Sequence, residues 1–417
     1  MAETKKKSIV NGFINVAQRL GGQIHLRSLR DAFASIMPFM ILAGFVTLIN
    51  YVILEPTGFM GKIVNPDTLK TWQEIGISIG NGTLSVITLL VTVAISYHLC
   101  LNRGYKNVIA PILVALSSFI VVTPIAMTFL PEGASKSIEV PNVIPVSYTG
   151  ASGMFVGIIV GLIATDLFIK LSKNKRMQIN LTGNIPPAVI KSFNVLIPIM
   201  ITVIIFSVMS FAVNQIFNMD FNTLVTTIIT KPLSYVTTSL PGFLLITSIA
   251  NLFFGLGIHQ AVISGPLLDP FLLQNMQENM VAYANHQEIP HIINMAFKDT
   301  FAVMGGSGNT IGLLIAIFIF GLPIVFNPLL IIPFVLAPIF SLTTAYYATA
   351  AGWINHVVVQ TPWTTPPIIS GFLATGGDWR ASVLQVIIIV VTVFIYLPFL
   401  RMDEKVAFAT AQKTEAK

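Results

Sequence analysis

The sequence predicts an all-α polytopic membrane protein with about ten transmembrane helices, re-entrant hairpins and one amphipathic helix at the membrane interface. Of its 417 residues, 54% are hydrophobic and only 10% are charged, whereas about a quarter of the residues in an average soluble domain are charged. The apolar runs last around twenty residues, the length that a helix needs to cross a bilayer. A membrane β-barrel would instead show alternating segments of about ten residues.

A basic N-terminal segment, residues 1–31, precedes the first apolar run. It holds Lys5–Lys7 and three arginines but no long apolar core, so it is expected to lie on the cytoplasmic surface and not to act as a cleavable signal. Spanning segments are then expected near 32–54, 77–100, 107–129, 149–172 and 192–217. The loops at 102–106 and 170–176 are basic and those at 55–76 and 131–148 are not, so the positive-inside rule places the N-terminus and the basic loops in the cytoplasm.

Residues 219–238 are less apolar and are expected to form an amphipathic linker along the interface. The second half, 239–400, opens with a spanning segment near 239–257, continues through a broken polar region at 258–308 and closes with a helix near 382–400. A tail, 401–417, is also expected in the cytoplasm, which requires an even number of crossings.

From Thr300 to Gly377 the chain has no Asp, Glu, Lys or Arg, although Gly and Pro are frequent. Within a bilayer, irregular backbone is tolerated only where it is buried in protein or lines a wet cavity. The second half is therefore expected to handle a polar solute. The lack of charge favours a neutral one, since ion-coupled transporters normally carry carboxylates inside the membrane.

Two glycine-rich elements offer polar groups in this half. His259 and Gln260 follow a glycine-rich helix end, where an imidazole and an amide suit hydroxyl ligands. The alternative is that His259 merely satisfies a neighbouring backbone carbonyl. The run Gly305–Thr310 lacks the lysine of a phosphate loop, which disfavours nucleotide binding. Its backbone N–H groups suit sugar hydroxyls or a phosphate-bearing partner, and a hinge between half-helices is the alternative.

Aromatic and neutral polar residues alternate at 353–356 and 360–367. Sugars are bound in this way, with ring faces stacked on aromatic side chains and hydroxyls paired with amides. Trp363 lies in a neutral, proline-rich segment and is expected to stack on a sugar ring. Trp379 lies beside Asp378 and Arg380 and is expected in the interfacial aromatic belt.

Other polar clusters are expected to be structural. The histidines of 286–291 are spaced by five residues around a proline, which indicates a solvated loop and not a metal site. The adjacent Lys298 and Asp299 are expected to satisfy an ion pair. Cys100 is the single cysteine, so no disulfide forms within the chain. No metal, cofactor or nucleic acid is expected.

Three elements together resemble the membrane-embedded IIC components of bacterial sugar phosphotransferase systems, in the lactose, cellobiose and diacetylchitobiose branch. They are Gly257-Ile258-His259, Gly305–Thr310 and Phe320–Pro328. The resemblance covers almost the whole chain, including the basic N-terminus and the Pro-Trp-Thr-Thr-Pro-Pro segment at 362–367.

The resemblance implies a homodimer in the bacterial cell membrane. The first five helices, 32–218, would form most of the dimer contact and hold no sugar, and 239–400 would hold the sugar between two re-entrant hairpins. A disaccharide of the cellobiose or diacetylchitobiose type would be exposed to the cytoplasm by alternating access. It would then take a phosphoryl group from a phosphocysteine on a separate IIB protein. The IIA protein acts upstream of IIB. The expected sugar-binding residues are Asn251, His259, Gln260, Ser307, Asn309, Trp363 and Thr364.

The sequence departs from the family at one position that matters for catalysis. The resemblance implies an Asn-Glu-Pro element before Phe320, whose Glu hydrogen-bonds the hydroxyl that is phosphorylated, but residues 315–319 contain no carboxylate. Either a segment of residues is missing from this chain between Asn309 and Phe320, or a shortened protein lacks its best general-base candidate. The catalytic residue is therefore unknown from the sequence.

Two other functions compete with this interpretation. An ion-coupled secondary transporter of a neutral solute would deliver free solute in response to an ion gradient. A membrane enzyme acting on lipid or glycan would turn over substrate in detergent without partners.

Overall fold

The structure is a computed structural model that describes residues 22–56, 60–131, 136–177, 187–317 and 327–415, together with Arg19 and Ile179. Lys5–Lys7 and most of the Phe320–Pro328 motif lie outside these residues. The chain forms two compact units. Unit 1 comprises Met1–Gly22, Met40–Gly80 and Ser234–Lys417, and unit 2 comprises Gln23–Phe39 and Asn81–Leu233. Residues 40–80 thus belong to the same unit as the second half of the chain.

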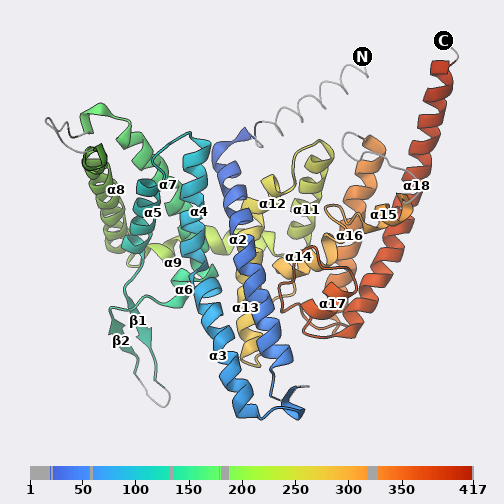
Figure 1. Cartoon of the computed structure of the whole chain (residues 1–417), viewed down its shortest axis with the longest axis horizontal. Helices are drawn as coiled ribbons and strands as arrows, with labels where there is room; N and C mark the ends of the chain where they lie inside the picture. The colour runs from blue at the N-terminus through green and yellow to red at the C-terminus, as the bar shows by residue number, and fades with distance from the viewer. Residues whose placement is uncertain are drawn as a thin grey trace. The chain divides into compact units, whose positions relative to one another are not determined.

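The predicted all-α membrane fold is confirmed (Figure 1). In the described part of the chain, six helices are long and apolar enough to span a membrane: Ile24–Ile53, Pro66–Asn102, Ala151–Ser172, Phe193–Phe217, Pro328–Ala350 and Trp379–Val406. A seventh is formed if Phe221–Thr237 and Leu240–Gly255, which bend by 81°, make one span. The count of about ten crossings stays a prediction.

Unit 2 packs four helices through small and hydroxyl side chains. They are α4 (Ile87–Asn102), α5 (Ile109–Val122), α7 (Met154–Ser172) and α8 (Pro187–Phe217). A Cβ on Gly157 of α7 would lie 2.7 Å from the side chains of Thr88 and Thr92 on α4. Thr165 donates to Ser96 Oγ at 2.7 Å. Small residues bring helices close together in this way in membranes, where burial of apolar surface gives no driving force.

Two polar side chains of the first half, His98 and Asp166, each have a partner in unit 2. His98 forms a hydrogen bond with Ser35 Oγ at 2.8 Å. Asp166 accepts two hydrogen bonds from Arg103, each at 2.8 Å, and pairs with His25.

Two predicted boundaries in the first half are wrong. Helix α2 spans Ile24–Leu48 and continues as a π-helical turn, Ile49–Ile53, so the helix starts inside the predicted surface segment. The segment predicted as a helix over 107–129 ends at Val122, because Thr123 precedes a proline and is extended, as proline imposes on its predecessor. A hairpin follows, in which β1 (Ala126–Phe129) pairs antiparallel with β2 (Ile138–Pro141).

The linker between the halves, 219–238, consists of short helices joined by a less regular turn. Short helices α9 (Phe221–Val225) and α10 (Lys231–Thr237) flank a π-helical turn at Thr226–Thr230, while another short helix, α6 (Val146–Thr149), lies earlier in the chain, before α7. Asp220 caps α9 by accepting from Thr223 N–H at 2.9 Å, the usual role of an acidic residue before a helix.

Unit 1 alternates long helices with short pieces. The long ones are α3 (Pro66–Thr83), α11 (Leu240–Gly255), α13 (Asp269–Ala284), α16 (Pro328–Ala350) and α18 (Trp379–Glu415), and the short ones are α12 (Ala261–Leu267), α14 (Met295–Ala302), α15 (Ile311–Ile317) and α17 (Ile369–Ala374). The region at 258–308 is broken, as its Gly and Pro residues predicted. Side-chain caps start three of these helices: Ser239 for α11, Asn294 for α14 and Asn327 for α16.

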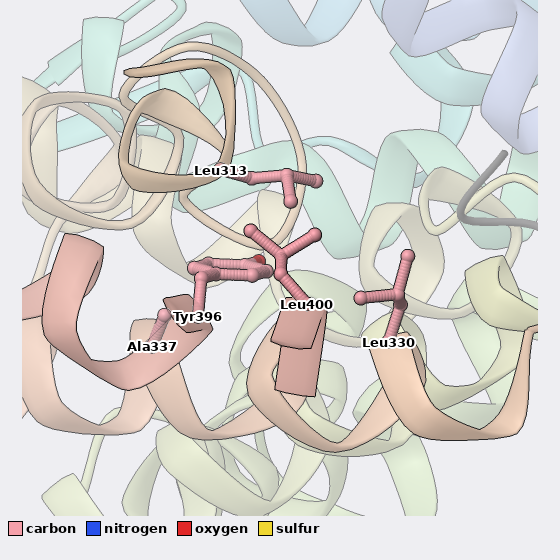
Figure 2. Close-up of a cluster of buried hydrophobic side chains, with 5 residues drawn as sticks. All are labelled: Leu313, Leu330, Ala337, Tyr396 and Leu400. Atoms are coloured by element: carbon pink, nitrogen blue, oxygen red, sulfur yellow. The ribbon is translucent and has the colours of Figure 1, made fainter. Parts of the chain in front are cut away.

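An apolar cluster joins α15, α16 and α18 in unit 1. Figure 2 shows its members, Leu313, Leu330, Ala337, Tyr396 and Leu400. The phenol of Tyr396 is fully buried and donates to the carbonyl of Gly308 at 2.8 Å. A buried tyrosine hydroxyl needs such a partner. The bond ties the glycine-rich loop to the core.

Candidate functional site

The irregular segment between α16 and α17 runs through the interior of unit 1. Val357, Val358 and Val359 are at most 2% exposed, although this segment has no regular structure of its own. The N–H groups of Val358 and Val359 donate to the carbonyl of Ala374 at 2.8 and 3.0 Å. Buried backbone must find partners, and here the helix that follows supplies them.

Asparagine side chains bond the backbone of this segment and of the neighbouring stretch at 291–293. Asn279 and Asn294 each donate to the carbonyl of Val357 at 3.0 Å. Asn279 also donates to the carbonyl of His291 at 2.7 Å and accepts from its N–H at 3.0 Å. Asn275 donates to the carbonyl of Ile293 at 2.7 Å. These residues were not predicted from the sequence, whose only signal was a pair of amides, Asn275 and Asn279, four residues apart on α13.

A lysine and two aspartates, all partly buried, lie beside this segment. Lys298 donates to Asp269 at 2.7 Å, while Asp299 accepts from Gln360 Nε2 at 2.8 Å. The predicted ion pair between Lys298 and Asp299 is therefore wrong in its partner. Adjacent residues of a helix project in directions about 100° apart, so the two side chains of α14 reach different neighbours.

Asp299 has an unusual protonation equilibrium. Burial raises the pKa of its carboxyl to about 6, against the opposing effects of Lys298 and of the hydrogen bond from Gln360. Perturbed groups of this kind cluster at functional sites, although structural networks perturb pKa values as well.

Gln360 connects this carboxylate to the irregular segment. Its side chain is buried, and its Oε1 atom has no hydrogen-bond partner. Buried polar atoms are nearly always paired, so an unpaired amide oxygen marks a place where a donor from a ligand fits. The backbone of Gln360 lies directly against Gly44 of α2, where a Cβ would come within 1.9 Å of the Gln360 carbonyl oxygen.

His259 is exposed and follows Gly257, whose φ of 82° favours glycine. Its Nδ1 accepts from the N–H of Ala261 at 3.2 Å, which places the proton of a neutral ring on Nε2. The imidazole thus bonds the first backbone N–H of α12, whereas the structural alternative expected it to satisfy a backbone carbonyl. Gln260 is partly buried at the start of α12, and Asn251 on α11 is buried with an unpaired Oδ1.

Phe334 of α16 brings the two glycine-rich elements together. The ring of His259 meets Phe254 edge-on at 6.1 Å, and Phe254 stacks on Phe334 at 5.2 Å. Phe334 also lies against Gly308, where a Cβ would come within 2.4 Å of the ring. The structure therefore places His259 and the Gly305–Thr310 loop around one aromatic pair.

The Gly305–Thr310 loop is internally bonded. Its N–H groups at Gly306 and Asn309, and that of Ile311, donate to backbone carbonyls of residues 303–306 at 2.8–3.2 Å. Asn309 donates to Ser341 Oγ at 2.5 Å, and Ser307 is partly buried. These contacts favour the predicted hinge over a loop whose N–H groups await a ligand.

Trp363 and Thr364 follow Gln360 by three and four residues and are both exposed. Stacking of Trp363 on a sugar stays a prediction. Trp379 is 67% exposed, next to the ion pair of Asp378 and Arg380, as an interfacial tryptophan would be.

Comparison with known proteins adds three findings. Residues 30–321 match the model of the family described as phosphotransferase system, EIIC. The chain is 31% identical to the lichenan permease IIC component of Bacillus subtilis (strain 168), covering 94% of this chain and 91% of that protein. It is 30% identical to the cellobiose-specific EIIC component of Geobacillus stearothermophilus, with 95% and 94% covered.

A solved structure is similar throughout. The crystal structure of the transporter ChbC, the IIC component from the N,N'-diacetylchitobiose-specific phosphotransferase system, matches with a TM-score of 0.86 and 28% identity, covering 95% of this chain and 98% of that one. The alignment with the lichenan permease runs over 419 residues while covering 94% of these 417. That relative therefore carries residues that are absent here.

Proposed function

The chain belongs to the EIIC family of the phosphotransferase system, and we propose that it binds a disaccharide of the cellobiose or diacetylchitobiose type. As a sugar-specific component, it is a multi-pass membrane protein that acts with IIB and IIA partners. The sugar type follows from relatives named for cellobiose and from the similar structure named for diacetylchitobiose. We further propose a homodimer whose two chain ends face the cytoplasm.

The observation that carries the proposal is the buried, neutral segment at 357–361. Its backbone is held by amide side chains, its flanks carry Trp363 and Thr364, and Gln360 keeps an unpaired oxygen. Uncharged hydrogen-bonding groups next to an aromatic face suit a sugar. The ring of His259 lies beside the Phe254–Phe334 pair, near the glycine-rich loop.

Transport by vesicles tests this function. Vesicles containing the protein are expected to accumulate sugar phosphate from labelled cellobiose or diacetylchitobiose only when phosphorylated IIB protein is present on the cytoplasmic side. The product is identified by chromatography. Free sugar accumulating under a proton or sodium gradient would favour the secondary transporter instead, and turnover in detergent without partners would favour a membrane enzyme.

Replacing His259 with alanine is expected to weaken disaccharide binding by about 1–3 kcal/mol, the cost of one unmade hydrogen bond to a buried ligand. Isothermal titration in detergent measures the affinity, and size-exclusion chromatography checks that the variant is folded. Wild-type affinity in a folded His259→Ala protein would restrict this residue to capping α12.

A further inference from the structure

Phosphorylation of a sugar hydroxyl requires a proton acceptor. If the proposed function holds, an O–P bond forms to the hydroxyl oxygen while the P–S bond of the donor phosphocysteine breaks, and sulfur leaves as a thiolate. The hydroxyl proton must go to a base held within hydrogen-bond reach, which typically contributes 10²–10⁴ in rate. Residues 300–377 contain no carboxylate, so an acidic base must come from outside that run.

Most acidic side chains near it are already occupied. In the described part of 239–400, four of them are not exposed: Asp269, Glu278, Asp299 and Asp378. Asp269 pairs with Lys298, Glu278 with His291 and Asp378 with Arg380. Asp299 is the exception, because its hydrogen-bond partner is the neutral amide of Gln360. A carboxylate without a cationic partner keeps its capacity to take a proton.

Histidines are the other common bases, and His259 does not fit that role. Its Nδ1 already accepts from Ala261, so the neutral ring offers a donor from Nε2. His291 is engaged by Glu278. His356 remains, and burial lowers the pKa of its imidazole, which makes it a weaker base at neutral pH than an ordinary histidine.

The position of Asp299 suits a hydroxyl ligand. Gln360 Nε2 holds Asp299 Oδ2 at 2.8 Å, and the unpaired Gln360 Oε1 belongs to the same amide. Asp299 Oδ1 accepts no hydrogen bond from any described residue, and the side chain is not fully buried. The charged groups closest to it, Lys298 and Asp269, are paired with one another.

We propose that Asp299 accepts the proton of the sugar hydroxyl during phosphoryl transfer, with Gln360 as the residue that positions its carboxylate. Asp299 then releases the proton to water or to the departing thiolate, which restores the carboxylate. With a pKa of about 6, the carboxyl is ionised at pH 7 and still basic enough to take a proton, which is the balance that general-base catalysis favours.

The test separates binding from chemistry in Asp299→Asn. Asparagine keeps an oxygen for Gln360 but cannot take the proton. Disaccharide affinity is expected to stay within about threefold of wild type, while sugar-phosphate formation with phosphorylated IIB falls at least about 100-fold. Glu278→Gln is the matched control, since it removes a carboxylate from the same unit, and it is expected to keep wild-type phosphorylation.

The pH profile gives a second readout. The wild-type rate is expected to rise as pH passes through about 6, while the residual rate of Asp299→Asn lacks that rise. A wild-type rate of phosphorylation in Asp299→Asn would overturn the assignment. So would an equal loss of rate in Asp299→Asn and in the control Glu278→Gln. If the wild-type protein itself forms no sugar phosphate, the proposed function fails and not only the role of Asp299.

Discussion

Replacing Gln385 with leucine is expected to destabilise the protein by about 3–5 kcal/mol. Gln385 is fully buried on α18, and its Oε1 accepts from the N–H groups of Ile368 and Gly371 at 2.7 and 2.8 Å. Its Nε2 donates to the carbonyl of Thr300 at 2.8 Å. Leucine fills a similar volume but leaves these backbone groups unpaired, and each costs about 1–3 kcal/mol when buried.

Denaturant unfolding in detergent measures this effect. Val386→Ala, at the exposed neighbouring position, is the control for a change on the same helix and is expected to cost less than about 1 kcal/mol, as surface substitutions usually do. A loss below about 1 kcal/mol in Gln385→Leu would mean that water replaces the amide.

The second large effect is expected at Gly44, where alanine should weaken disaccharide binding more than about tenfold. The added Cβ would lie 1.9 Å from the Gln360 carbonyl oxygen and 2.8 Å from its carbon, so helix and segment must move apart. Overpacking of this kind costs typically 1–3 kcal/mol. The movement displaces Gln360, whose side chain holds Asp299.

Gly80→Ala is the matched control for Gly44→Ala. Gly80 also lies in a helix of unit 1, and a Cβ there would meet nothing within 4 Å. This variant is expected to bind sugar normally and to gain up to about 1 kcal/mol of stability from helix propensity. Equal affinity of the two variants in titration experiments would contradict the role of Gly44 as a contact for the binding segment.

The fold class was predictable because composition and run length depend on the bilayer alone. The ends of the helices were harder to predict. Helix α2 begins at Ile24 and α5 ends at Val122 for local reasons, which hydrophobicity averaged over a long window does not show. The hairpin at 126–141 was missed because its strands are short and exposed.

The site was predicted less completely than the fold. The patterns of glycine, proline and charge located the broken region. Which polar groups form hydrogen bonds there depends on contacts between residues that are far apart in the sequence. Asp299 was assigned to its neighbour Lys298, and only the structure showed Gln360, 61 residues away, as its partner. Gly44 gave no signal, because nothing in α2 indicates what lies against it. Gln385 did give a signal in the sequence, because it is a lone amide in an apolar helix.

Helix α18 is longer than a membrane is thick. A hydrocarbon core about 30 Å deep takes about 20 residues, so a helix that starts at the interfacial Trp379 leaves the lipid near Arg401 and continues to Glu415. The remaining turns form a helical extension about 20 Å long. A spin label or fluorophore fixed near residue 412 would lie at a defined height above the bilayer. The distance from this label to a protein that binds the membrane surface nearby could then be measured.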